Sequence, residues 1–146
     1  ETCAVLRNLS KPTVALMHGV ALGSGYDYSL SCDFRLVTAD IRYGDPRIDR
    51  ALWAAEGWSY KLPRLIHQSP VGSISYLGKL MNGEAALQYG LIHRIISPEP
   101  DIRTSAMPFL SQLVQLSSEA YSRTKASITM ASDSTFKQTQ AFHTGF

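Results

Sequence analysis

The turn Gly23-Ser24-Gly25 is the segment of the sequence best suited to hold a negatively charged group. It follows an apolar run and precedes a helix-like stretch, so its backbone N–H groups would point outward from the start of a helix. Such groups, together with the positive end of the helix dipole, can hold a phosphate or a developing oxyanion. The turn lacks a following Gly-Lys-Ser/Thr, a third glycine for a dinucleotide motif, and the Gly-x-Ser-x-Gly spacing of a hydrolase elbow. By itself it is equally consistent with an ordinary tight turn.

Strand and helix patterns alternate around this turn and indicate an α/β protein. The apolar run 13–17 predicts a buried strand, and 25–32 predicts the helix that begins at the turn. Pro12 ends an initial helix over 1–9, because proline disfavours helical geometry at the residue before it. Residues 44–57 are expected to be irregular. Further strands are predicted over 34–38, 41–43 and 91–96 (the last a strand or an extended link), and helices over 58–66, 71–79, 84–89, 102–116 and 119–131.

The composition excludes several classes of protein. The chain has 146 residues, the length of one domain, and its hydrophobic share of 45% allows a real core. Its charged share of 18% and net charge of +2, with no basic block, argue against a disordered chain and against nucleic acid as the main partner. No apolar run is long enough to span a membrane. The four histidines are scattered, so we expect no metal site.

The cysteines and the first residues bear on location and completeness. Cys3 and Cys32 have no CxxC spacing, which favours two free thiols in a reducing compartment, the cytoplasm by default, over a disulfide. An organelle stays open. The chain begins without a methionine, a basic segment or a cleavage site, so we expect neither a signal peptide nor an ordinary start.

A longer pattern gives the turn a context. Lys11-Pro12 precedes the turn, an acidic residue follows it closely, and further motifs continue the pattern: Ser31-Cys32-Asp33, Tyr43-Gly44-Asp45-Pro46, Leu62-Pro63-Arg64-Leu65, Glu84-Ala85-Ala86 and Tyr89-Gly90-Leu91-Ile92. From about residue 5 to 135, this text resembles the crotonase family, also called the enoyl-CoA hydratase/isomerase superfamily. The resemblance is more specific for the fold than for the reaction.

The resemblance implies a fold and an assembly. The fold would be a partial crotonase-like (ClpP/crotonase) spiral of β-β-α units with C-terminal helices. Residues 1–100 would form the second half of the core, and 101–146 the start of the helical trimerisation region of a homotrimer or hexamer. Family members run to roughly 250 residues or more, so we expect the chain to be the later part of a longer one.

The resemblance also implies an oxyanion site. The backbone N–H of Ser24, at the family's middle glycine, would be one of two donors that stabilise the enolate of an acyl thioester. Removing one such donor typically costs roughly a hundred- to a thousandfold in rate. The substrate would be an acyl-CoA or an acyl-carrier thioester, with coenzyme A as part of the substrate and no separate cofactor.

Family hydratases use two carboxylates, and only the first has a counterpart here. Asp27 matches the first position, although it could simply complement a helix N-terminus. The second position, twenty residues later, is Arg47. An arginine stays protonated and cannot be a general acid or base at neutral pH. It could hold a substrate carboxylate in a bidentate pair, or pair with Asp45 or Asp49 on the surface.

Three further residues are candidates for the site. A shift of one residue would place Glu56 at a third catalytic position of the family, where apolar neighbours could raise its pKa. It could equally be a solvated glutamate at a helix N-terminus. Trp53 and Tyr26 would line the acyl pocket, or else serve as core or interface aromatics.

These residues favour double-bond isomerisation of an enoyl thioester, because that reaction needs only one well-placed base. Plain hydration by two glutamates is doubtful. A decarboxylase or a C–C hydrolase is the alternative, since Arg47 could bind a substrate carboxylate. A non-catalytic relative that serves as an assembly subunit is a further alternative, since the loss of the second carboxylate is what such a change would look like.

Overall fold

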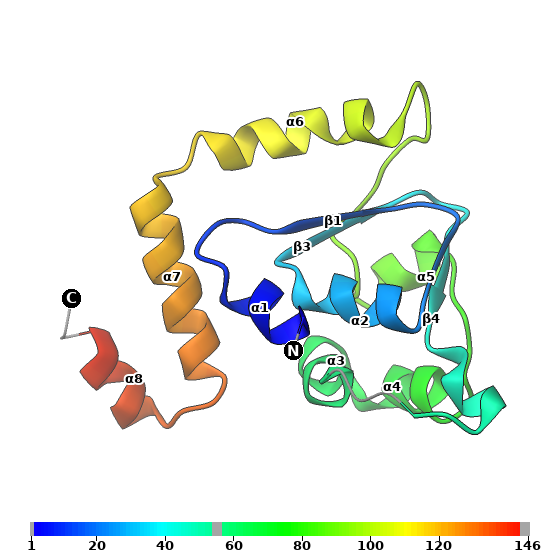
Figure 1. The fold of residues 1–146 in the computed structure, drawn as a ribbon, viewed down its shortest axis with the longest axis horizontal. Helices are drawn as coiled ribbons and strands as arrows, with labels where there is room; N and C mark the ends of the chain where they lie inside the picture. The colour runs from blue at the N-terminus through cyan, green and yellow to red at the C-terminus, as the bar shows by residue number, and fades with distance from the viewer. Residues whose placement is uncertain (1, 54–56, 144–146) are drawn as a thin grey trace.

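The computed structural model describes residues 2–53 and 57–143, and alternates short strands with helices (Figure 1). The strands are β1 (Val14–Met17), β2 (Val20–Leu22), β3 (Phe34–Val37), β4 (Arg42–Gly44) and β5 (Arg94–Ile95). The helices are α1 (Thr2–Asn8), α2 (Ser24–Ser31), the 3-10 helix η1 (Pro46–Arg50), α3 (Trp58–Leu65), α4 (Gln68–Ser75), α5 (Gly83–Gln88), α6 (Ile102–Val114), α7 (Ser118–Ala131) and α8 (Phe136–His143).

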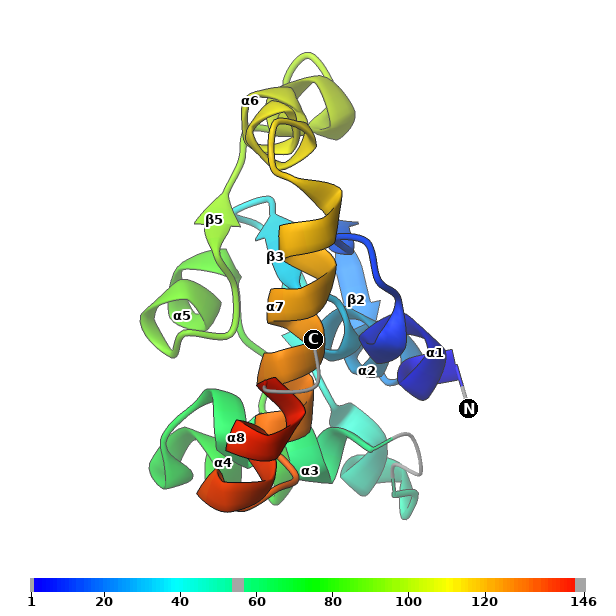
Figure 2. The same cartoon turned by 90° about the vertical axis from the view of Figure 1, so that its left-hand side faces the viewer.

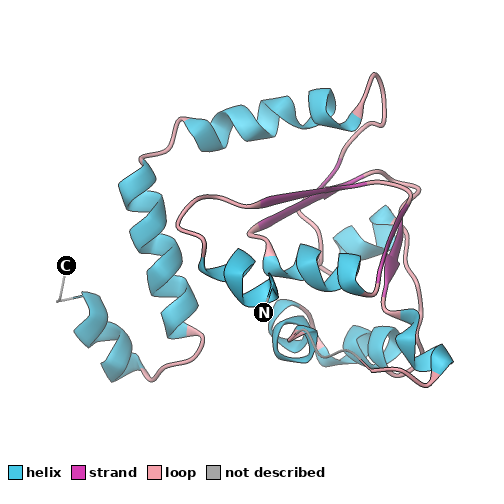
Figure 3. Cartoon of the chain, viewed as in Figure 1, coloured by secondary structure: helices cyan, strands magenta, loops and turns pink. Residues whose placement is uncertain are grey.

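The strands form two small parallel sheets, in the orders β1-β3-β5 and β2-β4. The chain leaves the first sheet after β1, turns at Gly19 with φ 65°, enters the second sheet as β2 and then forms α2. The next unit repeats this path through β3 and β4 before η1 and α3. Figure 3 shows helices on both sides of these strands. The expected spiral of β-β-α units in an α/β fold is confirmed.

The core lies where α2 packs against the two sheets. Tyr26 and Leu30 from α2 are buried together with Leu36 from β3 and Tyr43 from β4. Leu62 of α3 is fully buried as well, and contacts between α2 and α3 close this side of the core. The turn at the start of α2 is therefore carried by a helix that is anchored along its length.

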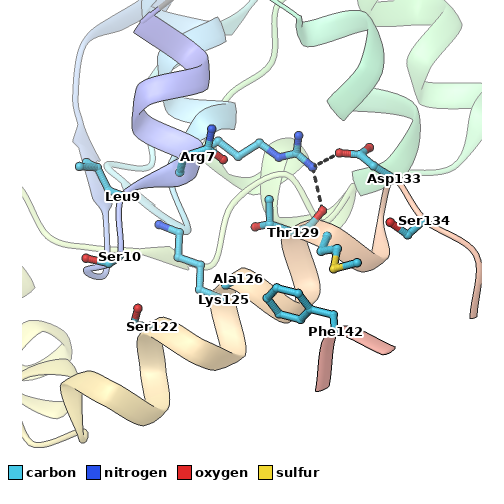
Figure 4. Close-up of a pocket in the computed structure, with 12 residues that line it drawn as sticks. Arg7, Leu9, Ser10, Ser122, Lys125, Ala126, Thr129, Asp133, Ser134 and Phe142 are labelled. Carbon is cyan, nitrogen blue, oxygen red and sulfur yellow. Dashed lines mark hydrogen bonds and ion pairs between the residues drawn. The ribbon is translucent and has the colours of Figure 1, made fainter. Parts of the chain in front are cut away.

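The last three helices form an arm around the body (Figures 1 and 2). α6 contacts the body through the buried Ala106 and through Phe109, whose ring meets that of Phe34 edge to face at 5.1 Å, whereas no residue of α7 is buried. Lys125 Nζ lies 2.7 Å from Asp33, and Arg7 of α1 pairs with Asp133 at 3.1 Å. Figure 4 shows Arg7 reaching Asp133 across a cavity of about 570 Å³ between α1, α7 and α8. Among the helices of the described ranges, none has the length and apolar content needed to cross a bilayer.

Several elements differ from the sequence-based predictions, and one of them is η1, which lies in the segment 44–57 that was expected to be irregular. β2 lies in the segment predicted as a turn, because three residues are too few to show a strand pattern. α4 begins at Gln68 instead of residue 71, and its Pro70 in the first turn is compatible with a helix start. α8 was not predicted from the sequence. Its Phe136 is exposed, so this large apolar side chain does not mark a helix face that packs on the core.

Candidate active site

The turn before α2 has the geometry of an anion-binding helix start. Gly23 is the N-cap, with φ 55° and ψ −118°, a conformation that L side chains rarely adopt. Its carbonyl accepts the first helical hydrogen bond, from the N–H of Asp27 at 3.0 Å. Ser24 and Gly25 are exposed, and a Cβ atom added at Gly23 or Gly25 would meet nothing within 4 Å. The first N–H groups of a helix have no partner inside it, and those of Ser24 and Gly25 make no hydrogen bond to another described residue.

Asp27, on the same helix, points to the inside of the protein and meets Arg47. Its side chain is fully buried, and Arg47 Nη2 lies 2.9 Å from Oδ1 and 2.8 Å from Oδ2. η1 supplies Arg47 near its start, and Asp45, the N-cap of η1, accepts a hydrogen bond from the backbone N–H of Arg47. The structure therefore brings residues 27 and 47 together, as a two-residue catalytic site requires.

Asp45 completes a cluster of three charges, here called the Asp-Arg-Asp cluster (Asp27, Arg47 and Asp45). Arg47 Nε donates to Asp45 Oδ1 at 2.6 Å, and Nη2 donates to Oδ2 at 2.8 Å. One guanidinium thus faces two carboxylates, which leaves a formal charge of −1. Partial burial opposes the charged form, but the hydrogen bonds to Asp45 and Asp27 raise the pKa of Arg47 overall. Arg47 therefore remains a cation.

Tyr26 lies in the core next to this cluster. Its side chain is completely buried, and its ring meets that of Tyr43 edge to face, with 4.9 Å between the centroids. The Tyr43 hydroxyl is 2.6 Å from Ser29 Oγ, and burial raises the pKa of Tyr43 to about 12. Burial likewise raises the pKa of Tyr26. This position favours the core interpretation of Tyr26 over a wall of the acyl pocket.

Of the other two candidates, one lies apart from these contacts and the other lies outside the described residues. Trp53 follows η1 and is 84% exposed, so its indole packs little against the described residues. Glu56 falls within 54–56 and lies outside the described residues. Within the described ranges, no group of three or more histidine, cysteine, aspartate or glutamate side chains is placed to hold a metal ion.

The structure adds a residue that positions α2 and that the sequence did not reveal. Arg35 of β3 is buried, and its Nη1 donates to the carbonyls of Ser29 at 3.2 Å and Cys32 at 2.7 Å, at the end of α2. Its Nε donates to the Leu91 carbonyl at 2.5 Å. Burial lowers the pKa of Arg35. A charged residue in the middle of an apolar strand was the available signal for it.

Comparisons with known proteins place the chain in a family. The family model described as "Enoyl-CoA hydratase/isomerase" matches residues 1–145. A crotonyl-CoA hydratase of Syntrophomonas wolfei is 28% identical over 111 residues, which are 74% of this chain and 43% of that protein. A carnitinyl-CoA dehydratase of Salmonella arizonae is 29% identical over 110 residues, 75% of this chain and 42% of that protein.

Solved structures show the same fold. An enoyl-CoA hydratase/isomerase from Cupriavidus metallidurans superposes with a TM-score of 0.89 and 24% identity, over 98% of this chain and 54% of that one. An enoyl-CoA hydratase from Thermoplasma volcanium gives a TM-score of 0.86 and 21% identity, over 97% and 55%. The chain thus spans about half the length of these relatives. It belongs to the enoyl-CoA hydratase/isomerase family, and its fold is the crotonase fold.

Proposed function

We propose that the protein acts on acyl thioesters through an enolate held at the start of α2, and that its reaction is the isomerisation of an enoyl thioester. The contact between Asp27 and Arg47 carries this proposal. Residues 27 and 47 face each other as in a two-carboxylate site, but only one of them is an acid. A reaction with a single proton-transfer group suits this arrangement best.

The chemistry needs one carboxylate and one oxyanion donor on the same helix. Asp27 would take a proton from the carbon next to the thioester carbonyl, and the N–H of Ser24 would stabilise the negative charge on the carbonyl oxygen. Returning the proton two carbons away moves the double bond. Hydration would also need a group that positions and deprotonates water, and Arg47 cannot accept a proton.

Asp45 gives Arg47 a second partner during this cycle. When Asp27 takes up a proton, Arg47 keeps its contacts of 2.6 and 2.8 Å with Asp45, so its charge stays compensated. The same cluster weakens the decarboxylase and C–C hydrolase alternatives. A substrate carboxylate would have to approach a cluster that already carries a formal charge of −1.

One observation favours a second candidate, a non-catalytic subunit that binds acyl thioesters. Asp27 is 1% exposed and is held at both carboxylate oxygens by Arg47, as in a purely structural ion pair.

The remaining parts of the proposal rest on family membership: coenzyme A or a carrier arm as part of the substrate without a separate cofactor, roles for Glu56 and Trp53, a homotrimer or hexamer, and a cytoplasmic location.

The test is to follow the conversion of 3-butenoyl-CoA to crotonyl-CoA by the purified protein. The variant Asp27→Asn should lose at least about a hundredfold in kcat, since a general base contributes that much. The control is Asp40→Asn, an exposed residue in the turn between β3 and β4, which should keep full activity. Full activity of Asp27→Asn would overturn the mechanism. Binding of crotonyl-CoA in calorimetry without any turnover would establish the non-catalytic subunit instead.

A further inference from the structure

A second cavity lies at the opposite end of α2 from the oxyanion turn. It has a volume of about 240 Å³ and lies where the end of α2 meets α1, α3 and α7. The eight residues of α2 separate it from Ser24 by about 12 Å along the helix axis. The cavity therefore does not belong to the oxyanion site. It is smaller than a pocket for a whole coenzyme, and its size suits a short acyl group.

Three cationic side chains line this cavity: Arg7 of α1, and Lys61 and Arg64 of α3. The Arg64 guanidinium stacks over the ring of Tyr60 at 3.7 Å from its centroid, and that of Arg7 lies at 5.4 Å. Arg64 also donates to the Tyr60 carbonyl at 2.8 Å. Both arginines are thus held in place at the cavity.

Lys61 differs from these arginines because its amine donates no hydrogen bond to any described residue. In the described part of the chain, Lys61 makes no hydrogen bond and no ion pair. Asp33, which lines the cavity, is already paired with Lys125 at 2.7 Å, and Asp133 is paired with Arg7 at 3.1 Å. The Lys61 amine is therefore a half-buried group at a cavity wall, beside other cations.

The surroundings of Lys61 favour its neutral, nucleophilic form. Burial, with the positive charges of Arg7 on α1 and Arg35 on β3, lowers the pKa of Lys61 to about 8. The thiols of Cys3 on α1 and Cys32 at the end of α2 act in the opposite direction, but more weakly than burial. At pH 7.5 roughly a quarter of such an amine is neutral, against roughly a thousandth for an ordinary lysine.

We propose that Lys61 is a site of covalent acylation by acyl thioesters. The Nζ atom attacks the thioester carbonyl carbon, a C–N bond forms, and the C–S bond breaks. The thiolate leaves and takes up the proton that the amine loses, so the products are an amide and a free thiol. Arg7 and Arg64 would attract the phosphates of a coenzyme A thioester to the cavity. The proposal rests on the proposed function only for the source of the thioester.

The test is to incubate the protein with acetyl-CoA and measure the acetylation of each lysine by peptide mass spectrometry between pH 6.5 and 9. Lys79 and Lys137, which are exposed, are internal controls on the same chain. At pH 7.5 Lys61 should react about tenfold faster or more, because its larger neutral fraction outweighs the lower nucleophilicity of a weaker base. Its rate should rise steeply up to about pH 8 and then by less than about twofold between pH 8 and 9, whereas the control rates should keep rising steeply over that last unit.

Acetylation of Lys61 no faster than that of Lys137, or a Lys61 rate that rises as steeply between pH 8 and 9 as the control rates do, would overturn the proposal. The variant Lys61→Arg, checked for an unchanged circular dichroism spectrum, should lose only the label at position 61. Repeating the labelling on Asp27→Asn separates this proposal from the proposed function. Labelling that persists while wild-type turnover is absent would refute the isomerase and leave Lys61 acylation standing.

Discussion

Replacing Arg47 with methionine is expected to destabilise the protein strongly, because it leaves two buried carboxylates without their cation. The substitution removes the contacts of 2.8 and 2.9 Å to Asp27 and those of 2.6 and 2.8 Å to Asp45. The side chain of Asp27 has 0% exposure and that of Asp45 has 6%, so water cannot replace the guanidinium at either acid.

The magnitude follows from this burial. Breaking a buried ion pair by removing one partner costs roughly 3 to 5 kcal/mol. Arg47 itself retains 18% side-chain exposure, so we place the loss at the low end of the range. A loss of about 3 kcal/mol corresponds to a fall in the melting temperature of roughly 6 to 12 °C for a chain of this size.

The assay is urea unfolding followed by circular dichroism at pH 7.5, with a matched control on the surface. Arg123→Met removes the same kind of side chain from an ion pair of similar length, 2.7 Å to Glu119, but with 51% and 73% side-chain exposure. The control should change the free energy of unfolding by less than about 0.5 kcal/mol. An Arg47→Met loss below about 1 kcal/mol, or equal to that of Arg123→Met, would refute the reasoning from burial.

Two further predictions concern packing and pH. A Cβ at Gly83 would lie 2.8 Å from the Thr38 carbonyl oxygen, so Gly83→Ala should lower the free energy of unfolding by about 1 to 3 kcal/mol. The control Gly72→Ala, whose added Cβ would lie 3.7 Å from its nearest contact, should not lower it. Equal unfolding midpoints for the two variants would contradict this prediction. Burial and the neighbouring Arg35 lower the pKa of His93, so the unfolded chain binds more protons, and stability should fall as the pH drops below about 6.5. Urea titrations of the protein and of His93→Gln between pH 5 and 8 measure this, and an equal pH dependence of both would exclude His93 as the cause.

Local patterns predicted most of the secondary structure that positions the site. The strand predicted over 13–17 appears as β1, and the helix predicted over 25–32 appears as α2. The glycine turn lies at the start of α2, as the spacing predicted. Ser117 caps α7, because its Oγ accepts a hydrogen bond from the backbone N–H of Ala120, three residues later. β2 could not be predicted, since a strand of three residues is defined by its partner β4 and not by its own pattern.

The candidate site was only partly predictable. A pairing of Arg47 with Asp45 or Asp49 was among the alternatives from sequence, but it was expected on the surface, whereas the pair with Asp45 that forms has a buried carboxylate. Its pairing with Asp27 spans twenty positions and was not predicted. Whether the Tyr26 side chain is buried in the core could not be predicted either, since an aromatic residue in a first helical turn can face the core or a ligand.

By itself, the sequence determined the order of strands and helices, the glycine turn with its outward N–H groups, and the presence of one acid where a two-acid site has two. These properties depend on neighbours a few residues apart, which local backbone geometry controls. Only the tertiary structure decided that Arg47 holds Asp27 and Asp45 together, that Arg35 anchors the end of α2, and that Lys61 faces a cavity with no counterion among the described residues. Charge pairing and burial depend on which elements meet in space, and distance along the chain does not specify that.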